Sequence, residues 1–384
     1  MGKRRMIHIL TVFGTRPEAI KLAPVIRALE GRSDQFRSSV CVTAQHREML
    51  DQVLHLFSIR PDYDLDIMKP KQDLYGITAE ILLKFREVLR KVQPDLILVQ
   101  GDTTTTFAAS LSAFYERIRI GHVEAGLRTY DKYKPFPEEI NRHLTSVLAD
   151  YHFAPTDRAR LHLVKEGFPE ENVFVTGNTV IDALFLIVKG QSTPEGRERM
   201  KTFFSKEFPP SAPVQRLILV TAHRRESFGE GFENICLALR EIALRNPDVH
   251  IVYPVHLNPN VREPVYRIVG GLDRVHLLEP LEYEPFVHLM NRSYFILTDS
   301  GGIQEEAPSL GKPVLVMREV TERPEALEAG TARLVGSKKE SIIREAQKLL
   351  DNPAEYQKMA HKKNPYGDGR ASERIVEILA RLMI

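Results

Sequence analysis

The chain has 384 residues, of which 43% are apolar and 27% are charged, a composition that excludes a disordered protein. This length predicts two domains of about 190 residues each. The 53 basic and 51 acidic residues leave a net charge of +2, which excludes a strongly polyanion-binding protein, so we expect no nucleic-acid partner. Two cysteines, Cys41 and Cys236, cannot form a disulfide framework or a four-thiolate zinc site, which favours a reducing compartment.

The N-terminus faintly resembles a signal peptide, because residues 2–5 are basic and residues 6–13 are mostly apolar. The apolar part is too short, contains His8 and continues into Gly14 without a small-residue cleavage site. We therefore interpret it as a first β-strand. No apolar run approaches the ~18 residues needed to span a bilayer. We expect a cytoplasmic protein without a membrane partner.

Short apolar runs rich in β-branched residues alternate with helical patterns along nearly the whole chain. The predicted strands of the first half are residues 7–13, 39–43, 96–99, 118–123 and 151–154. Those of the second half are residues 217–221, 249–253, 275–278, 294–298 and 313–317. The clearest helix lies between Ile77 and Val92, where apolar residues recur at helical spacing. Because the strand runs are apolar throughout, they indicate parallel strands covered on both faces.

This alternation predicts an α/β fold with parallel sheets. The segment 190–213 is polar, charged and rich in proline, and it follows a predicted helix at residues 179–189. Two doubly wound domains therefore meet near residues 175–215.

Polar, charged and glycine residues gather directly after the predicted strands in both halves. In an open α/β sheet, ligands bind at the carboxyl ends of the strands. In the first half, these positions hold Gly14, Arg16, Lys21, Gly101, Asp102, Glu124 and Arg128. In the second half, they hold His223, Arg224, His256 and the run from Asp299 to Glu306. The shared position favours a functional interpretation over a random set of surface loops.

Each of these features also has a purely structural interpretation. Asp102 could be only a helix N-cap, and Arg16 could be a solvated loop residue. Glu124 could form an ion pair with Arg128. Residues 223–225 could be an exposed basic turn, and residues 300–302 could be only a tight turn.

The segment Ser300-Gly301-Gly302 has the clearest physical use. Glycines let backbone N–H groups approach an anion, and the following helix offers its positive N-terminal end. Carboxylates at Glu305 and Glu306, in the first turns of that helix, can accept hydrogen bonds from a ribose diol. These features outline a nucleoside diphosphate site. Positive charge would come from Arg16, Lys21, His223 and Arg224.

Several familiar motifs are absent from the sequence. No Gly-x-Gly-x-x-Gly follows a strand and no Walker phosphate loop occurs, which disfavours bound NAD and ATP hydrolysis. No His-Glu-x-x-His motif or Cys/His cluster indicates a zinc site, and no Gly-x-Ser-x-Gly elbow is present. We therefore expect neither a cofactor nor a metal.

Long strings of sequence carry a family resemblance. They include VFGTRPEAIK at residues 12–21, GDTTTT at 101–106, GHVEAGLR at 121–128 and HRRE at 223–226. Shorter ones lie at residues 43–47, 137–139, 253–256, 299–308, 321–325 and 364–369. Together they cover essentially the whole chain, which resembles the non-hydrolysing UDP-N-acetylglucosamine 2-epimerases.

This resemblance implies two Rossmann-like domains around a central cleft, as in type B glycosyltransferases. Residues 1–180 would hold the sugar-side carboxylates, residues 181–365 would bind UDP, and residues 366–384 would pack back on the first domain. Family members interconvert UDP-GlcNAc and UDP-ManNAc without NAD or metal. A homodimer that supplies ManNAc units for cell-surface polysaccharide is expected.

The reaction itself dictates which side chains are needed. The proton on sugar C2 is not acidic, so inversion without a hydride carrier requires elimination of UDP to 2-acetamidoglucal and its re-addition. Carboxylates must face the sugar and cations the departing diphosphate. The expected catalytic residues are Asp102, Glu124, Glu138 and His223. The expected substrate- and UDP-binding residues are Arg16, Lys21, Arg142, Ser300, Gly301, Gly302 and Glu306.

The resemblance also suggests a second, activating UDP-GlcNAc molecule. The matching positions are Gln45, His46, Gln72, Arg224 and His256. Here the chain departs from some activated members, because Glu48 and Lys71 replace Gln and Arg. Strict dependence on the activator therefore stays open.

Three alternatives to this epimerase also stay open. One is a glycosyltransferase of the same architecture, and another is a non-catalytic sensor of nucleotide sugars. The third is a hydrolysing relative that releases ManNAc and UDP.

Overall fold

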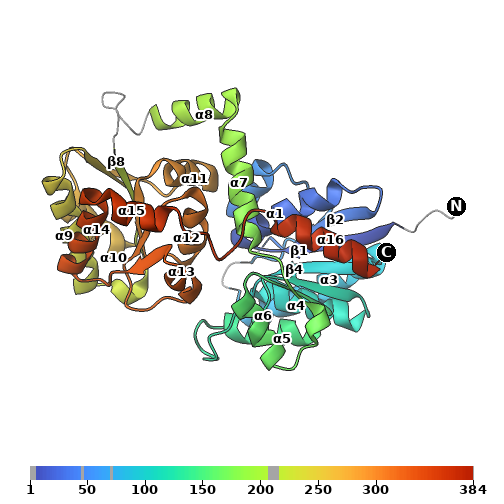
Figure 1. The fold of residues 1–384 in the computed structure, drawn as a ribbon. Coiled ribbons are helices and arrows are strands. Elements are labelled where there is room, and N and C mark those ends of the chain that lie inside the picture. Colours follow the sequence, from blue (N-terminus) through green and yellow to red (C-terminus); the bar gives the residue numbers. More distant parts are fainter. Residues whose placement is uncertain (1–5, 45–46, 70–71, 206–215, 384) are drawn as a thin grey trace. The chain divides into compact units, whose positions relative to one another are not determined.

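The computed structural model describes residues 6–44, 47–69, 72–205 and 216–383. The chain divides into two compact units, which are drawn in Figure 1. Unit 1 comprises Met1–Ala183 together with Tyr366–Ile384, and unit 2 comprises Leu184–Pro365.

Unit 1 is built on a seven-stranded parallel sheet with the order β3-β2-β1-β4-β5-β6-β7. Its strands are β1 (Ile7–Phe13), β2 (Phe36–Val42), β3 (Tyr63–Asp64), β4 (Leu96–Gln100), β5 (Arg119–Val123), β6 (Tyr151–Ala154) and β7 (Val173–Val175). Every residue of β1 is buried, as a strand covered on both faces requires. The helices around it are α1 (Arg16–Glu30), α2 (Arg47–Leu56), α3 (Leu74–Val92), α4 (Thr104–Tyr115), α5 (Glu138–Leu148), α6 (Asp157–Lys165) and α16 (Ala371–Met383), with a short helix at Glu170–Asn172. The division between the units falls within α7 (Thr179–Gln191), after Ala183.

Unit 2 is built on a six-stranded parallel sheet with the order β10-β9-β8-β11-β12-β13. Its strands are β8 (Arg216–Thr221), β9 (Val249–Pro254), β10 (Val275–Leu278), β11 (Phe295–Thr298), β12 (Val314–Val316) and β13 (Ala332–Leu334). Its helices are α8 (Pro194–Ser205), α9 (Glu230–Arg245), α10 (Pro259–Val269), α11 (Tyr283–Arg292), α12 (Gly301–Glu306), α13 (Pro324–Glu328), α14 (Lys339–Asp351) and α15 (Pro353–Ala360), with short helices at Arg225–Ser227 and Ala307–Leu310.

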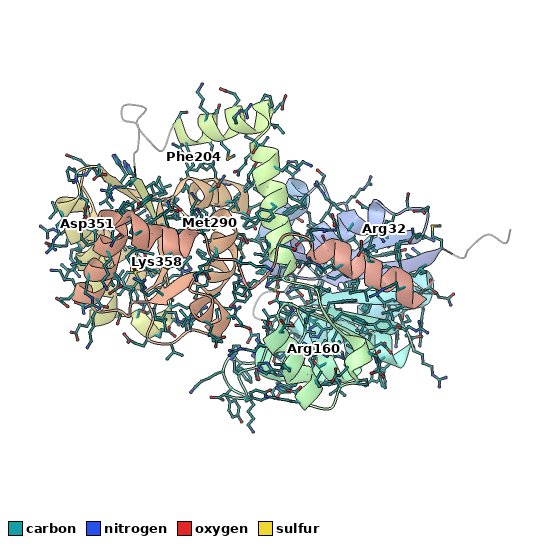
Figure 2. All side chains as sticks on the ribbon, viewed as in Figure 1. Arg32, Arg160, Phe204, Met290, Asp351 and Lys358 are labelled. Carbon is teal, nitrogen blue, oxygen red and sulfur yellow. The ribbon has the colours of Figure 1, made fainter. Side chains whose placement is uncertain are left out.

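The α/β fold class predicted from the sequence is confirmed, and every predicted strand is present. Three short strands of two or three residues each, β3, β7 and β13, are additional. The charged segment after residue 190 also contains a helix, α8, that the sequence did not indicate. Phe204 of α8, labelled in Figure 2, stacks on His288 of α11 with ring centroids 5.1 Å apart. This contact explains how a charged, proline-flanked segment is held as a helix.

The last helix, α16, lies beside α1 of unit 1 (Figure 1). A buried carboxylate, Asp182 of α7, holds its first turn by accepting hydrogen bonds from the backbone N–H groups of Ala371 and Ser372, at 3.1 and 2.7 Å. Asp182 therefore satisfies N–H groups that have no partner within the helix.

No helix in the described ranges is both long and apolar enough to cross a membrane. Both cysteines, Cys41 and Cys236, are buried and free, one in each unit. Their burial raises the pKa of both thiols, that of Cys236 to about 12.

Two buried histidines lie side by side in the sheet of unit 1. His122 of β5 pairs in register with His152 of β6, and both are almost fully buried. The His122 Nε2 atom donates to the carbonyl oxygen of Gly101 at 2.7 Å, which fixes the neutral tautomer. Burial lowers the pKa of His122 to about 4 and that of His152 to about 3. Both rings are therefore neutral at pH 7.

We predict that acid destabilises unit 1 through these two rings. In the unfolded chain a histidine titrates near pH ~6.5, so the unfolded state binds more protons once the pH falls below that value. The stability contributed by neutral His122 is complete above pH ~6.5 and is lost as the pH falls towards about 4. Urea unfolding between pH 7 and pH 5 measures the loss, and His152→Phe should make it smaller. The control His361→Gln, at an exposed position, should leave it unchanged. An unaltered pH dependence in His152→Phe would contradict this account.

Candidate functional site

The sequence-predicted residues of unit 1 meet at the carboxyl edge of its sheet. Strands β1, β4 and β5 are neighbours and run parallel, so the loops that follow them lie together. The backbone N–H of Gly101, after β4, donates to the carbonyl of Val123 at 3.0 Å. The β4 and β5 loops are therefore joined directly.

Glu124 occupies a constrained position at the end of β5. Its φ is +64°, a left-handed conformation that is uncommon for residues other than glycine. Its side chain is 7% exposed, accepts a hydrogen bond from Gln100 Nε2 at 2.7 Å and forms an ion pair with Lys21. The structural alternative of a Glu124–Arg128 pair is wrong, because Arg128 is paired with Glu166 at 2.8 Å. Lys21, expected at the diphosphate, lies here against a carboxylate.

Asp102 is held by Arg142. Both the Nε atom, at 3.0 Å, and the Nη2 atom of this guanidinium donate to Asp102 Oδ2. The N-cap of α4 is Thr103, so the interpretation of Asp102 as an N-cap is wrong. The Asp102 side chain remains 26% exposed, which leaves it accessible to a ligand.

The adjacent residues Glu138 and Glu139, at the start of α5, have different environments. Glu138 is half-buried and makes no hydrogen bond or ion pair with any residue that the structure describes. Glu139 is 1% exposed and accepts hydrogen bonds from the backbone N–H groups of Thr129 and Tyr130 and from Arg142. Burial opposes ionisation of Glu139, but these backbone N–H groups and Arg142 hold its pKa below the usual value. Glu139 therefore orders the loop, and of the pair only Glu138 is available for chemistry.

Sequence reasoning missed the part played by Glu139. A carboxylate in the first turn of a helix is a common stabilising feature, so the sequence could not distinguish the roles of Glu138 and Glu139.

Arg16 is the first residue of α1 and is half-buried.

In unit 2, a buried aspartate organises the loop after β8. Asp299, at the end of β11, is fully buried, and its Oδ2 atom accepts hydrogen bonds from the backbone N–H groups of His223 and Arg224 at 2.6 and 2.7 Å. Its Oδ1 atom lies 3.6 Å from His223 Nδ1. This organising role of Asp299 was also missed from the sequence, since it depends on β8 and β11 being neighbours.

His223 remains accessible despite these contacts. Its side chain is 41% exposed, and its ring stacks on that of His256 with centroids 5.5 Å apart. Partial burial is the main cause that lowers the pKa of His223, and Asp299 opposes it. An accessible histidine can donate a hydrogen bond and can transfer a proton.

The segment after β11 begins helix α12, whose N-cap is Ser300 and whose first residue is Gly301. The backbone N–H of Ser300 already donates to Thr298 Oγ1 at 2.9 Å. The two carboxylates that follow have different partners, because Glu305 pairs with Arg323 and Glu306 accepts a hydrogen bond from the Tyr283 hydroxyl at 2.7 Å. Both side chains are at least nine-tenths buried.

The residues expected for a second ligand are only partly described. Gln45 and His46 lie outside the described residues. Gln72 is in unit 1, where its Oε1 atom accepts a hydrogen bond from the Lys69 N–H at 3.3 Å. Arg224 and His256 are in unit 2, beside His223. Of these residues, the structure places Arg224 and His256 near each other, both beside His223.

No group of three or more His, Cys, Asp or Glu side chains that could hold a metal ion occurs within the part of the chain that the structure describes. Two carboxylates of the site are paired with cations, Glu124 with Lys21 and Asp102 with Arg142.

Comparisons with known proteins give a consistent result. A sequence model of the family described as UDP-N-acetylglucosamine 2-epimerase matches residues 27–380. The UDP-N-acetylglucosamine 2-epimerase of Salmonella typhimurium is 59% identical over 97% of this chain and 98% of its own. The crystal structure of the Neisseria meningitidis UDP-GlcNAc 2-epimerase bound to UDP-GlcNAc is 55% identical, covers 98% of this chain and 100% of its own, and superposes with a TM-score of 0.88.

A more distant likeness concerns the fold alone. The glycotransferase of kitacinnamycin is 14% identical over 98% of this chain and 100% of its own, with a TM-score of 0.65. The two-sheet architecture is therefore shared with a glycosyltransferase, as the type B comparison predicted. The family match and the relatives at well over 30% identity show more than a shared fold: the chain belongs to the UDP-N-acetylglucosamine 2-epimerase family.

Proposed function

We propose that this protein inverts C2 of UDP-N-acetylglucosamine to give UDP-N-acetylmannosamine, reversibly, as a non-hydrolysing epimerase. The observation that carries the proposal is the set of carboxylates at the carboxyl edge of unit 1. Asp102, Glu124 and Glu138 come from three successive segments after β4 and β5 and at the start of α5. Membership of the epimerase family supports the choice of substrate.

The proposed route is elimination followed by re-addition. Cleavage of the C1–O bond expels UDP, and a carboxylate removes the C2 proton to leave 2-acetamidoglucal. Return of a proton to the opposite face and re-addition of UDP then give the epimer. General acid–base catalysis at C2 and electrostatic stabilisation of the diphosphate are the two contributions required of the protein.

The pairing of charges in unit 1 suggests how the roles divide. Glu138 is the carboxylate without a described partner, which suits proton transfer at C2. Asp102 is held by Arg142 but partly exposed, which suits a second acid–base group. Glu124 is the most enclosed of the three, and we assign it to the developing positive charge of the sugar.

Unit 2 would hold the nucleotide. We assign the diphosphate to Ser300, Gly301 and Gly302. Arg16, Lys21 and Arg142 of unit 1 stay proposed as substrate-binding residues. His223 would assist departure of the diphosphate. Glu306, whose orientation is set by Tyr283, would accept the hydrogen bonds of the ribose. The set Gln45, His46, Gln72, Arg224 and His256 stays proposed for an activating UDP-GlcNAc.

The biological setting rests on the family resemblance. We propose that the product supplies ManNAc units for cell-surface polysaccharide. Action in the cytoplasm stays a prediction.

Turnover of UDP-GlcNAc in D₂O tests the proposal. We expect UDP-ManNAc carrying deuterium at C2, because a proton removed by a carboxylate exchanges with solvent. Asp102→Asn and Glu138→Gln should each lower the rate by ~10²-fold or more, as loss of an acid–base group does. The control Asp34→Asn, at an exposed position in the turn between α1 and β2, should retain full activity. His223→Ala should slow exchange and epimerisation together.

The same experiment separates the alternatives. Complete retention of hydrogen at C2 would overturn the elimination route. Transfer to an acceptor would indicate a glycosyltransferase, free ManNAc a hydrolysing enzyme, and binding without turnover a sensor. Near-normal turnover in Glu138→Gln would remove Glu138 from proton transfer.

A second prediction concerns the ribose. Glu306→Ala should raise the dissociation constant for UDP by ~10-fold, the scale of one lost charge-assisted hydrogen bond. Tyr283→Phe keeps the carboxylate but removes the hydroxyl that orients it, so its effect should be smaller. Calorimetry measures both, with the exposed neighbour Glu282→Ala as the control. Unchanged UDP affinity in Glu306→Ala would place the ribose elsewhere.

We also propose a homodimer, and an apolar stripe on α5 supports it. Ile140, Leu144 and Val147 recur at helical spacing and are 41%, 42% and 71% exposed. Exposed contiguous apolar surface of this kind marks protein–protein contacts. Leu144→Glu should therefore convert the dimer to a monomer in sedimentation velocity, while Leu244→Glu on α9 should not. A wild-type monomer, or a dimer that survives Leu144→Glu, would contradict the proposal.

A further inference from the structure

One carboxylate, that of Glu18, links the two loops that carry the first charged groups of the site. Glu18 lies in the first turn of α1 and is 1% exposed. Its Oε2 atom accepts hydrogen bonds from the backbone N–H groups of Gly14 and Thr15 at 3.1 and 2.8 Å. Its Oε1 atom accepts one from the Thr103 hydroxyl at 2.7 Å and lies 3.1 Å from the Thr106 hydroxyl.

The two hydroxyl groups do not contribute equally. Thr106 has a single hydroxyl proton, and its shorter contact, at 2.6 Å, is with the carbonyl of Gln100. Its contact with Glu18 is therefore the weaker one. Thr103 donates to Glu18 and also accepts from the Thr106 backbone N–H at 3.1 Å, as the N-cap of α4. The link from α1 to α4 thus runs mainly through Thr103.

The loop after β1 also packs closely against its neighbours at Gly14. A Cβ atom at Gly14 would lie 2.1 Å from Thr43 Oγ1 and 2.4 Å from Thr105 Oγ1. Real Cβ atoms do not approach other atoms so closely, so only glycine fits there. The loop after β1 therefore packs directly against the start of α4. Glu18 connects the same two segments through hydrogen bonds.

Each linked loop delivers a residue of the proposed chemistry. Thr15 directly precedes Arg16, and Thr103 directly follows Asp102. Arg142 and the Asn141 side chain hold Asp102 from the α5 side, the latter through the Asp102 carbonyl at 3.0 Å. Glu18 holds the same loop from the α1 side. A displacement of about 1 Å at such a group can lower the rate by ~10²-fold.

We propose that Glu18 is a positioning residue, which holds the Asp102 loop against the Arg16 loop without itself touching the substrate. This inference deepens the proposed function and rests on it for the effect on turnover. A mere contribution to stability is the alternative. The two differ because a positioning role lowers kcat in a variant that is still fully folded.

The glutamine variant is the decisive one. In Glu18→Gln, an amide oxygen can still accept from Gly14 and Thr15, whereas the NH₂ group then faces Thr103, whose hydroxyl must turn to accept. The fold of the β1 loop is kept, and the hydrogen bond that Thr103 donates to Glu18 is lost. Thr103→Val removes the same bond from the other side. Glu18→Ala removes the whole link and is the variant at risk of misfolding.

We expect Glu18→Gln and Thr103→Val to lower kcat by about 10-fold or more, with KM for UDP-GlcNAc changed by about 2-fold or less and with melting temperatures near that of the wild type. The matched control is Glu345→Gln, which alters a buried, ion-paired glutamate of α14 in unit 2. That variant should lose stability without loss of kcat. Normal kcat in both Glu18→Gln and Thr103→Val would overturn the proposal.

Hydrogen–deuterium exchange gives a readout that does not need activity. Glu18→Gln should raise exchange by about 10-fold or more both at residues 14–16 and at residues 101–106, because the bond that Thr103 donates to the carboxylate no longer opposes local opening. Unchanged exchange at residues 101–106 would overturn the link. If the wild-type chain fails to epimerise UDP-GlcNAc, the proposed function fails while the exchange result still decides whether Glu18 couples the loops.

Discussion

Parallel pairing of buried strands is the constraint on which the site of this protein depends. Because β1, β4 and β5 are adjacent and run in the same direction, the loops after all three open at one edge of the sheet. The same holds for β8, β9 and β11 in unit 2, which bring His223, His256 and Asp299 together. Residues more than a hundred positions apart, such as Lys21 and Glu124, thereby become neighbours. The pairing of the strands brings them together.

Charge neutralisation is the second constraint at these edges. The carboxylates of Asp102 and Glu124 are partly removed from water and are each paired with a cation, Arg142 and Lys21. Burying an unpaired charge is costly, so these pairs allow carboxylates to sit in an enclosed site before any substrate arrives.

Three further carboxylates serve the backbone rather than the ligand. Glu18, Glu139 and Asp299 each accept hydrogen bonds from the backbone N–H groups of two consecutive residues. The loops bonded to Glu18 and Asp299 carry or adjoin a proposed site residue, and Glu139 itself directly follows Glu138. Rigid support of this kind favours catalysis because the reactive groups need not be reordered when the substrate binds.

The sequence by itself determined the fold class, the strands longer than three residues and the family of this protein. Short, continuous, β-branched apolar runs favour strands covered on both faces, and the strings after them are long enough to be specific. The sequence also identified Asp102, Glu124 and Glu138 as candidates, because a position after a predicted strand follows from the order of residues alone. It could not separate Glu138 from Glu139, nor foresee the helix α8.

Those distinctions belong to the tertiary structure, because they depend on contacts between distant segments. Glu139 is structural because the Thr129–Tyr130 loop folds over it, and Glu124 pairs with Lys21 instead of Arg128 because β1 and β5 flank β4. Glu18 reads in the sequence only as a residue of the first helical turn. Its link to Thr103 exists because the sheet places α1 beside the start of α4, a proximity that no local pattern of residues encodes.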